Sequence, residues 1–246
     1  MLTHTVDSFA SENLGCHRIG GVLMKSRRLL TDPGDYEAIR NRMASFFYLD
    51  RRFPEDVYRL SGVRTVFIEY EVGISSGFWL ALSRLAEMFG DTSVDFLVVD
   101  PAHGSVNIPA SWDVYPAFSI DVTSSTDDFA DAITEPTPDA EGIWMVGDLS
   151  NVVAITGRSG LWGCWGERNS GIMAIRAPDG DAFRVWREEV DLYLWGTYGI
   201  LDIIAFNCRD WLVPHEFLDP FVENYRWMPG VRALDRMAFG LTGPPN

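Results

Sequence analysis

The amino-acid sequence predicts an α+β fold, with a single domain over residues 1–246, a mixed or antiparallel sheet, a hairpin near 161–176 and flanking helices. Three observations predict this fold. Apolar residues recur at helical spacing in some windows, alternate as in a strand in others, and flank a short polar link in the hairpin region. Apolar residues also make up 47% of the 246, which is enough to form a core of ordinary size.

The first two elements follow from apolar periodicity. Residues 35–48, DYEAIRNRMASFFY, carry apolar side chains at near-helical spacing after a Thr-Asp-Pro-Gly start, which predicts an amphipathic helix. Residues 64–72 alternate between apolar and other side chains and therefore predict a strand. Glu69 and Glu71 fall on one face of that strand, so we expect this face to be half exposed.

The chain then gives a helix, a strand and an irregular stretch. Residues 75–89 predict a helix, and residues 94–99, VDFLVV, predict a short buried strand. Residues 112–142 are the least regular part of the chain. Within them, residues 135–142, EPTPDAEG, predict an exposed loop and the only weak candidate for a domain boundary. Because strands are expected on both sides of this loop, the sequence favours one domain.

Most of the predicted strands lie in the second half of the chain. Four are expected, over residues 143–146, 152–156, 161–167 and 171–176. The last two flank the polar link Arg168–Ser170, which predicts an antiparallel hairpin in which Cys164 is buried. The C-terminal third is rich in aromatic residues, and helices are expected over 188–198 and 217–225.

Signals for export, membranes, metals and cofactors are lacking in the sequence. The N-terminal residues have no apolar run typical of a signal peptide, and the most apolar window, residues 193–206, is shorter than the roughly 20 residues that cross a bilayer. The cysteines form no C-x-x-C pair, the histidines have no metal-ligand spacing, and no Walker A or G-x-G-x-x-G pattern occurs. We therefore expect a cytoplasmic protein with reduced thiols, no membrane association, no metal and no cofactor.

The negative charge of the chain is concentrated in its middle. The formal net charge is −15, and residues 85–157 hold 13 acidic side chains with no lysine or arginine. Such a field repels phosphate backbones, which argues against nucleic-acid binding, and it attracts basic proteins. Part of the acidic segment also predicts a helix over 127–133, capped by the S-x-x-D pattern of Ser125 and Asp128. The acidic residues expected to contact a basic protein partner are Asp121, Asp127, Asp128, Asp131, Glu135, Asp139 and Glu141.

One motif indicates an alternative, enzymatic function. Residues 73–77, GISSG, match the G-x-S-x-G pattern of a nucleophile elbow and lie between a predicted strand and a predicted helix. The order Ser75, Asp148, His215 resembles the chain order of the catalytic triad in α/β-hydrolases, which implies a serine hydrolase with Ser75 as nucleophile. The elbow strand of that family is central, parallel and covered on both faces. Because the acidic residues just before the motif indicate a half-exposed strand, a simple glycine-bounded turn is favoured.

Charge and aromatic content together favour a protein that binds another protein. Acidic side chains steer a basic partner towards the surface, and aromatic side chains hold the complex once it has formed. We therefore expect an acidic cytosolic interaction protein, comparable in physical type to bacterial immunity proteins that inhibit a basic toxin. The serine hydrolase that uses Ser75 remains the alternative, and whether the chain has any catalytic activity stays open.

Overall fold

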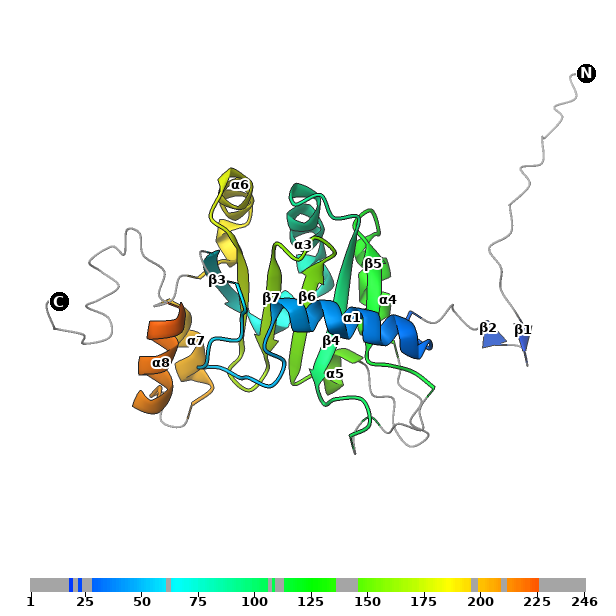
Figure 1. Ribbon diagram of the computed structural model, residues 1–246. Helices are drawn as coiled ribbons and strands as arrows, with labels where there is room; N and C mark the ends of the chain where they lie inside the picture. Colours follow the sequence, from blue (N-terminus) through cyan, green and yellow to red (C-terminus); the bar gives the residue numbers. More distant parts are fainter. Residues whose placement is uncertain are drawn as a thin grey trace, which may run out of the picture.

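The computed structural model describes residues 28–60, 63–105, 108, 113–135, 146–195, 199–208 and 212–225, together with the backbone of two short strands. These two strands, β1 (Arg18–Ile19) and β2 (Val22–Leu23), pair with each other in antiparallel orientation. The main body is built from the other described elements (Figure 1).

An antiparallel sheet of six strands organises this body, in the spatial order β3-β8-β7-β6-β4-β5 (Figure 1). The strands are β3 (Val63–Glu69), β4 (Ser93–Asp100), β5 (Ala117–Asp121), β6 (Val152–Gly157), β7 (Gly163–Glu167) and β8 (Ile172–Pro178). β4 pairs with β6, so strands from both sides of residues 135–142 share one sheet. The predicted α+β class with an antiparallel sheet is confirmed.

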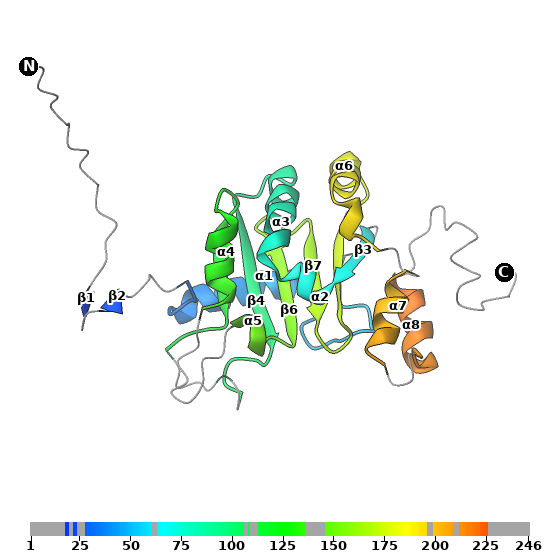
Figure 2. The same cartoon turned by 180° about the vertical axis from the view of Figure 1, so that it is seen from behind.

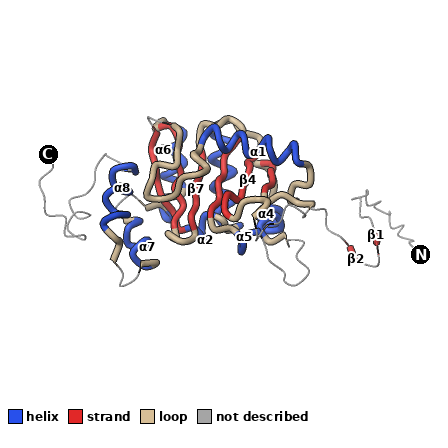
Figure 3. The backbone as a smooth tube through the Cα atoms, turned by 60° about the horizontal axis from the view of Figure 1, so that its bottom comes forward, coloured by secondary structure: helices blue, strands red, loops and turns tan. Residues whose placement is uncertain are grey.

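Helices cover both faces of the sheet, as the opposite views of Figures 1 and 2 show. One face carries α2 (Tyr70–Gly73), α3 (Ser76–Met88), α4 (Thr126–Ile133), α5 (Val146–Leu149) and α6 (Asp181–Glu189). The other face carries α1 (Pro33–Phe46), α7 (Ile200–Phe206) and α8 (His215–Tyr225). Figure 3 shows the strands lying between α1 on one side and α4 on the other.

The interior strands β6 and β7 are buried along their whole length, because both of their faces are covered. Successive side chains alternate between two cores. The cross-strand pair Ile155 and Cys164 packs into the core under α3, whereas the neighbouring pair Ala154 and Trp165 packs into the core under α1. This arrangement requires apolar residues on both faces, which explains the nearly continuous apolar sequence of β6.

The predicted hairpin is confirmed. β7 and β8 pair in antiparallel register with Glu167 opposite Ile172, and the link between them ends at Gly171, whose φ of 73° is the left-handed conformation that glycine adopts most readily. Cys164 has no exposed surface, and burial raises the pKa of its thiol. The helices expected near residues 35–48, 75–89, 127–133 and 217–225 are also present, as α1, α3, α4 and α8.

The prediction for residues 64–72 was wrong in two respects. The strand ends at Glu69, and residues 70–73 form the short helix α2. The strand is also not half exposed, because Phe67 is completely buried on the face that was expected to meet solvent. α7 and α8 cover this face, and Trp195 forms a β-bridge with Phe67 on the outer edge of the strand. These contacts come from residues more than a hundred positions away in sequence, so local alternation could not indicate them.

Two further predictions need correction, and some elements were not predicted at all. Val146 begins the helix α5 where a strand over 143–146 was expected, and residues 143–145 lie outside the described residues. A helix over 188–198 is not observed in its described part, because α6 ends at Glu189 and a short 3-10 turn, Asp191–Tyr193, follows. The edge strand β5 and the helices α6 and α7 were not predicted, since a short segment gives too few periods to identify.

A buried carboxylate fixes the corner where β6 ends. Asp91, which is 6% exposed, accepts hydrogen bonds from the Ser159 backbone N–H, the Ser159 hydroxyl and the Trp162 indole N–H, at 2.5, 2.9 and 2.8 Å. These bonds join the loop after α3 to the loop between β6 and β7. Gly157 allows the close approach, because a Cβ at this position would lie 1.9 Å from Asp91 Oδ2.

We expect Gly157→Ala to destabilise the fold by about 1–3 kcal/mol, since the added methyl would force Asp91 away from its three donors. The measurement is the free energy of unfolding from urea titration. Gly180→Ala is the matched control, because a Cβ there meets no atom within 4 Å. The explanation is wrong if the two alanine variants unfold at the same urea concentration.

Candidate functional site

A polar cleft of about 450 Å³ lies where β4 and β7 end and β6 begins. Its volume falls within the range of roughly 300–1,000 Å³ that is typical of ligand pockets. The turn after β7, the end of α7 and the start of α8 complete its walls. The polar side chains that line it are Arg52, Asp100, Asn151, Glu167, Asn169, Ser170 and Glu216, with Cys208 beside them.

Glu167 is the most buried charged residue of this cleft, with 7% of its surface exposed. Its Oε1 accepts two hydrogen bonds, from the Phe53 backbone N–H and from the Trp165 indole N–H, both at 2.8 Å. Within the described part of the chain, Oε2 has no hydrogen-bond donor. Burial raises the pKa of Glu167, and the two hydrogen bonds and the nearby Arg52 oppose that rise.

The rim of the cleft is held by hydrogen bonds of its own. The Asn151 side chain donates to Asp100 Oδ2 at 3.2 Å, and the Asn151 backbone N–H donates to the Asp100 carbonyl at 2.8 Å. The Asn151 carbonyl in turn accepts from the Arg168 backbone N–H at 2.8 Å. The ends of β4, β6 and β7 are thereby tied together, so this part of the cleft is formed in advance of any ligand.

The charges that line the cleft are unequal. Among the described residues of the lining, Asp100, Glu167 and Glu216 supply three carboxylates and Arg52 supplies one guanidinium. Arg52 Nη1 donates to the carbonyls of Leu49 and Arg51 at 3.1 and 2.6 Å, so part of its hydrogen-bonding capacity is used by its own loop. The described lining therefore carries an excess of negative charge, which favours cations.

The structure does not bring together the residues of the alternative triad. Ser75 precedes α3, and its half-buried hydroxyl donates to the Val72 carbonyl at 2.7 Å. His215 begins α8 on the opposite face of the sheet, while Asp148 lies in α5 (Figures 1 and 2). The strand before Ser75 is β3, which lies at the edge of an antiparallel sheet, unlike the central parallel strand of an α/β-hydrolase.

The acidic residues predicted to contact a partner fall into two groups. Two of them, Glu135 and Asp128, hold other segments of the fold in place. Glu135 Oε2 accepts from the backbone N–H groups of Arg28 and Leu29, at 2.5 and 2.9 Å, and holds the start of the described chain. Asp128 completes a capping box with Ser125 and pairs with Arg28 at 2.5 Å, and these hydrogen bonds lower its pKa.

The remaining described acidic residues of the set are exposed or half-buried. Asp121 is exposed and accepts hydrogen bonds from the side chain and backbone of Thr123, which lower its pKa. Asp127 is exposed in the first turn of α4, and Asp131, one turn further on, is half-buried. Residues 139 and 141, the last two of the predicted set (Asp139 and Glu141), lie outside the described residues.

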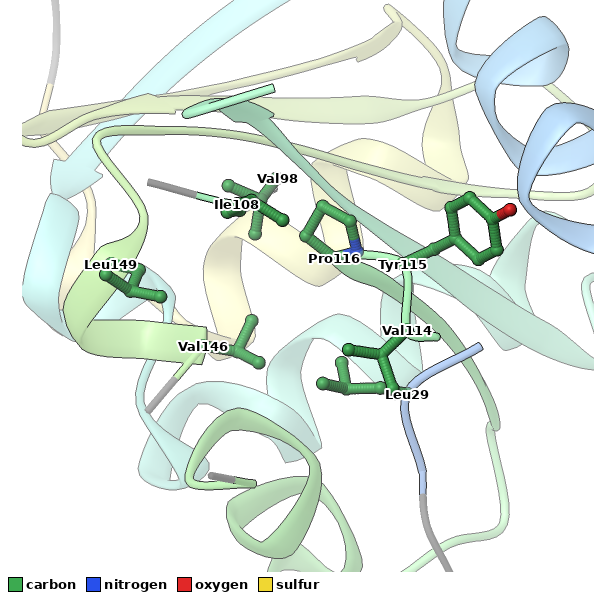
Figure 4. A pocket seen from close by; sticks show the side chains of 8 residues that line it. All are labelled: Leu29, Val98, Ile108, Val114, Tyr115, Pro116, Val146 and Leu149. Atoms are coloured by element: carbon green, nitrogen blue, oxygen red, sulfur yellow. The ribbon is translucent and has the colours of Figure 1, made fainter. Parts of the chain in front are cut away.

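A second cavity is not a credible ligand site. It measures about 10 Å³, close to the space of a single water molecule. Apolar side chains surround it in Figure 4, and the Tyr115 hydroxyl points away from the others. The lining residues are Leu29, Val98, Ile108, Val114, Tyr115, Pro116, Val146 and Leu149. This cavity is a gap in the packing of the core.

The described residues show neither a metal cluster nor a membrane-spanning helix. No three His, Cys, Asp or Glu side chains converge closely enough among these residues to hold a metal ion. No described helix combines the length and the apolar character that a membrane crossing requires. Comparison with known proteins gives no relative: no family model, curated protein or solved structure matches the chain.

The cleft was not predicted from the sequence. The signal that was available is Glu167 itself, an acidic residue that closes an otherwise apolar strand. Its neighbours in the cleft come from distant segments, since Phe53 is 114 positions away. No spacing motif in the sequence could therefore have joined them.

We expect Glu167→Gln to change how stability depends on pH, because the amide oxygen can accept the same two hydrogen bonds without a charge. A raised pKa means that the wild-type carboxyl stabilises the fold below its unfolded pKa of about 4.3, and that this contribution is lost as the pH rises through the folded pKa. The variant should therefore gain on the order of 1 kcal/mol relative to wild type as the pH rises. Urea unfolding at a series of pH values measures this. Curves that stay parallel at all pH values would contradict the assignment.

Ser75 gives a second test. Because its hydroxyl is bonded to Val72 and His215 lies on the opposite face of the sheet, we expect no reaction with a fluorophosphonate probe. Mass spectrometry of the intact protein measures the labelled fraction. Stoichiometric labelling that disappears in Ser75→Ala would establish a serine hydrolase instead.

Proposed function

We propose that this protein is an acidic interaction protein of the cytosol that binds a basic protein partner, as an immunity or inhibitor protein binds a basic toxin. The contact surface is the acidic face, defined here as Asp121, Asp127 and Asp131 at the end of β5 and along α4. The observation that supports this most is the exposure of Asp121 and Asp127 in a segment, residues 85–157, that contains no lysine or arginine.

The balance of charge around α4 supports the proposal. Asp127 and Asp128 lie in the first turn of α4, where carboxylates are also stabilised by the helix dipole. Arg28 neutralises Asp128 from outside the segment, whereas no ion pair of Asp121 or Asp127 is found with the described residues. Carboxylates that face solvent at this density raise the local concentration of a basic partner and speed its association.

Some acidic side chains can be substituted without disturbing the fold, whereas others stabilise it. Asp128 and Glu135 bond to Ser125, Arg28 and Leu29, so their substitution would disturb folding. Asp121→Asn keeps the acceptor oxygen that bonds to Thr123, and the Asp127 side chain accepts no hydrogen bond from the described residues. Asp121→Asn combined with Asp127→Asn therefore removes two charges and preserves the local structure.

We expect this double variant to bind the partner with an association rate lowered by roughly tenfold at low salt and with a nearly unchanged dissociation rate. Raising the salt concentration should slow the wild-type association much more than that of the variant, since screening acts on the long-range encounter. The partner is isolated by affinity capture from the native host, and the rates are measured by surface plasmon resonance.

The matched control removes two exposed charges from the opposite face of the sheet, by Glu37→Gln on α1 and Glu223→Gln on α8. This control should associate nearly as fast as the wild type if the acidic face is the contact surface. If the two double variants associate at equal rates, or if no basic protein is captured, the proposal is wrong and the acidic face serves only to keep the protein in solution.

A further inference from the structure

We propose that the cleft around Glu167 binds a guanidinium group, as a site separate from the acidic face. The group can belong to an arginine side chain of a protein or to a small guanidino compound, because both present the same planar, donor-rich cation. Glu167 at the floor and Glu216 at the rim would accept its hydrogen bonds.

The second oxygen of Glu167 is the observation that points to a ligand. Glu167 is only 7% exposed, and its Oε1 already accepts hydrogen bonds from two donors. Oε2 accepts no hydrogen bond from the described residues, and it is not one of their fully buried unsatisfied atoms, so it remains open to an incoming donor. Since Glu167 lines the cleft, a donor that enters the cleft can satisfy this oxygen.

The distribution of the carboxylates favours an extended cation over a metal ion. Asp100, Glu167 and Glu216 line one cleft, but they do not belong to any described cluster that could hold a metal. A guanidinium spreads its charge over a planar fork with five N–H donors, so it can reach carboxylates that are too far apart to share a small ion.

The apolar walls favour a guanidinium over an ammonium. Phe53 and Phe217 lie in the lining together with Val152 and Ile204. A guanidinium is weakly hydrated and stacks on aromatic rings, whereas an ammonium keeps its water and loses more when it enters such a cleft.

In the part of the lining that the structure describes, Arg52 is the feature that opposes a cation. Its guanidinium lies 5.8 Å from the centre of the Trp165 ring, and its Nη1 is bonded to two backbone carbonyls of its own loop. Among the described lining residues, one guanidinium against three carboxylates leaves an excess of two negative charges, so Arg52 reduces the attraction without reversing it.

The test is a titration of the full chain with N-butylguanidine, followed by NMR at the Trp165 indole N–H and by calorimetry, in a mildly alkaline buffer that keeps the carboxylates ionised. Trp165 donates to Glu167, so its signal reports on the floor of the cleft. We expect a Kd on the order of 1 mM for this small probe, and binding of N-butylamine weaker by roughly tenfold.

Three variants locate the site. Glu167→Gln and Glu216→Gln should each weaken binding of N-butylguanidine by roughly tenfold. Glu223→Gln, which removes an exposed charge of the same helix outside the lining, should leave it unchanged. Glu216 is exposed, so its variant remains informative if Glu167→Gln fails to fold. The Asp121→Asn and Asp127→Asn double variant should bind the probe like wild type, which separates this proposal from the acidic face.

Two further arms identify the source of the group. Tighter binding of a blocked Gly-Arg-Gly peptide than of free arginine would indicate a protein side chain, and the reverse order would indicate a small molecule. Either result supports a guanidinium site. The proposal is overturned if N-butylguanidine does not bind, if N-butylamine binds equally well, or if Glu223→Gln weakens binding as much as the two cleft variants.

Discussion

The buried guanidinium of Arg176 is the contact on which one whole side of the protein depends. Arg176 lies in β8, is 5% exposed, and donates to Thr65 Oγ1 at 2.8 Å and to Asp56 Oδ1 at 2.9 Å. Its charge also lies 4.2 and 5.4 Å from the ring centres of Tyr58 and Tyr225. An arginine at this depth is tolerated only when its donors are satisfied, so the sheet, the loop over residues 47–60 and α8 are held in one arrangement.

That arrangement also builds the cleft. The Tyr225 hydroxyl donates to the Glu55 carbonyl at 2.6 Å and accepts from the Val57 N–H at 3.1 Å, so α8 is fixed to the loop over residues 47–60. The same loop presents the Phe53 N–H to Glu167. The two walls of the cleft are thus positioned by contacts outside it, which is the way in which proteins hold a binding site in a defined geometry without a ligand.

Negative charge serves two different purposes in this chain. Asp91, Asp128 and Glu135 accept hydrogen bonds from loops and from a helix terminus, and their carboxylates hold the fold. Asp121 and Asp127 face solvent and contribute mainly a field. A sequence shows both kinds as the same residue type, so charge density alone overstates the number of carboxylates that are available to a partner.

Local signals in the sequence were sufficient for the elements with strong periodicity or caps, such as α3, the capping box of Ser125 and the hairpin that buries Cys164. They were insufficient for the coverage of β3, which depends on α7 and α8 more than a hundred positions away. They also gave no indication of the cleft, because its walls come from separate segments, such as the loop that presents Phe53, 114 positions from Glu167. The reason is physical. Backbone conformation responds to neighbours within a few residues, whereas the burial of a strand face and the partners of a carboxylate such as Glu167 depend on which distant segments pack against it.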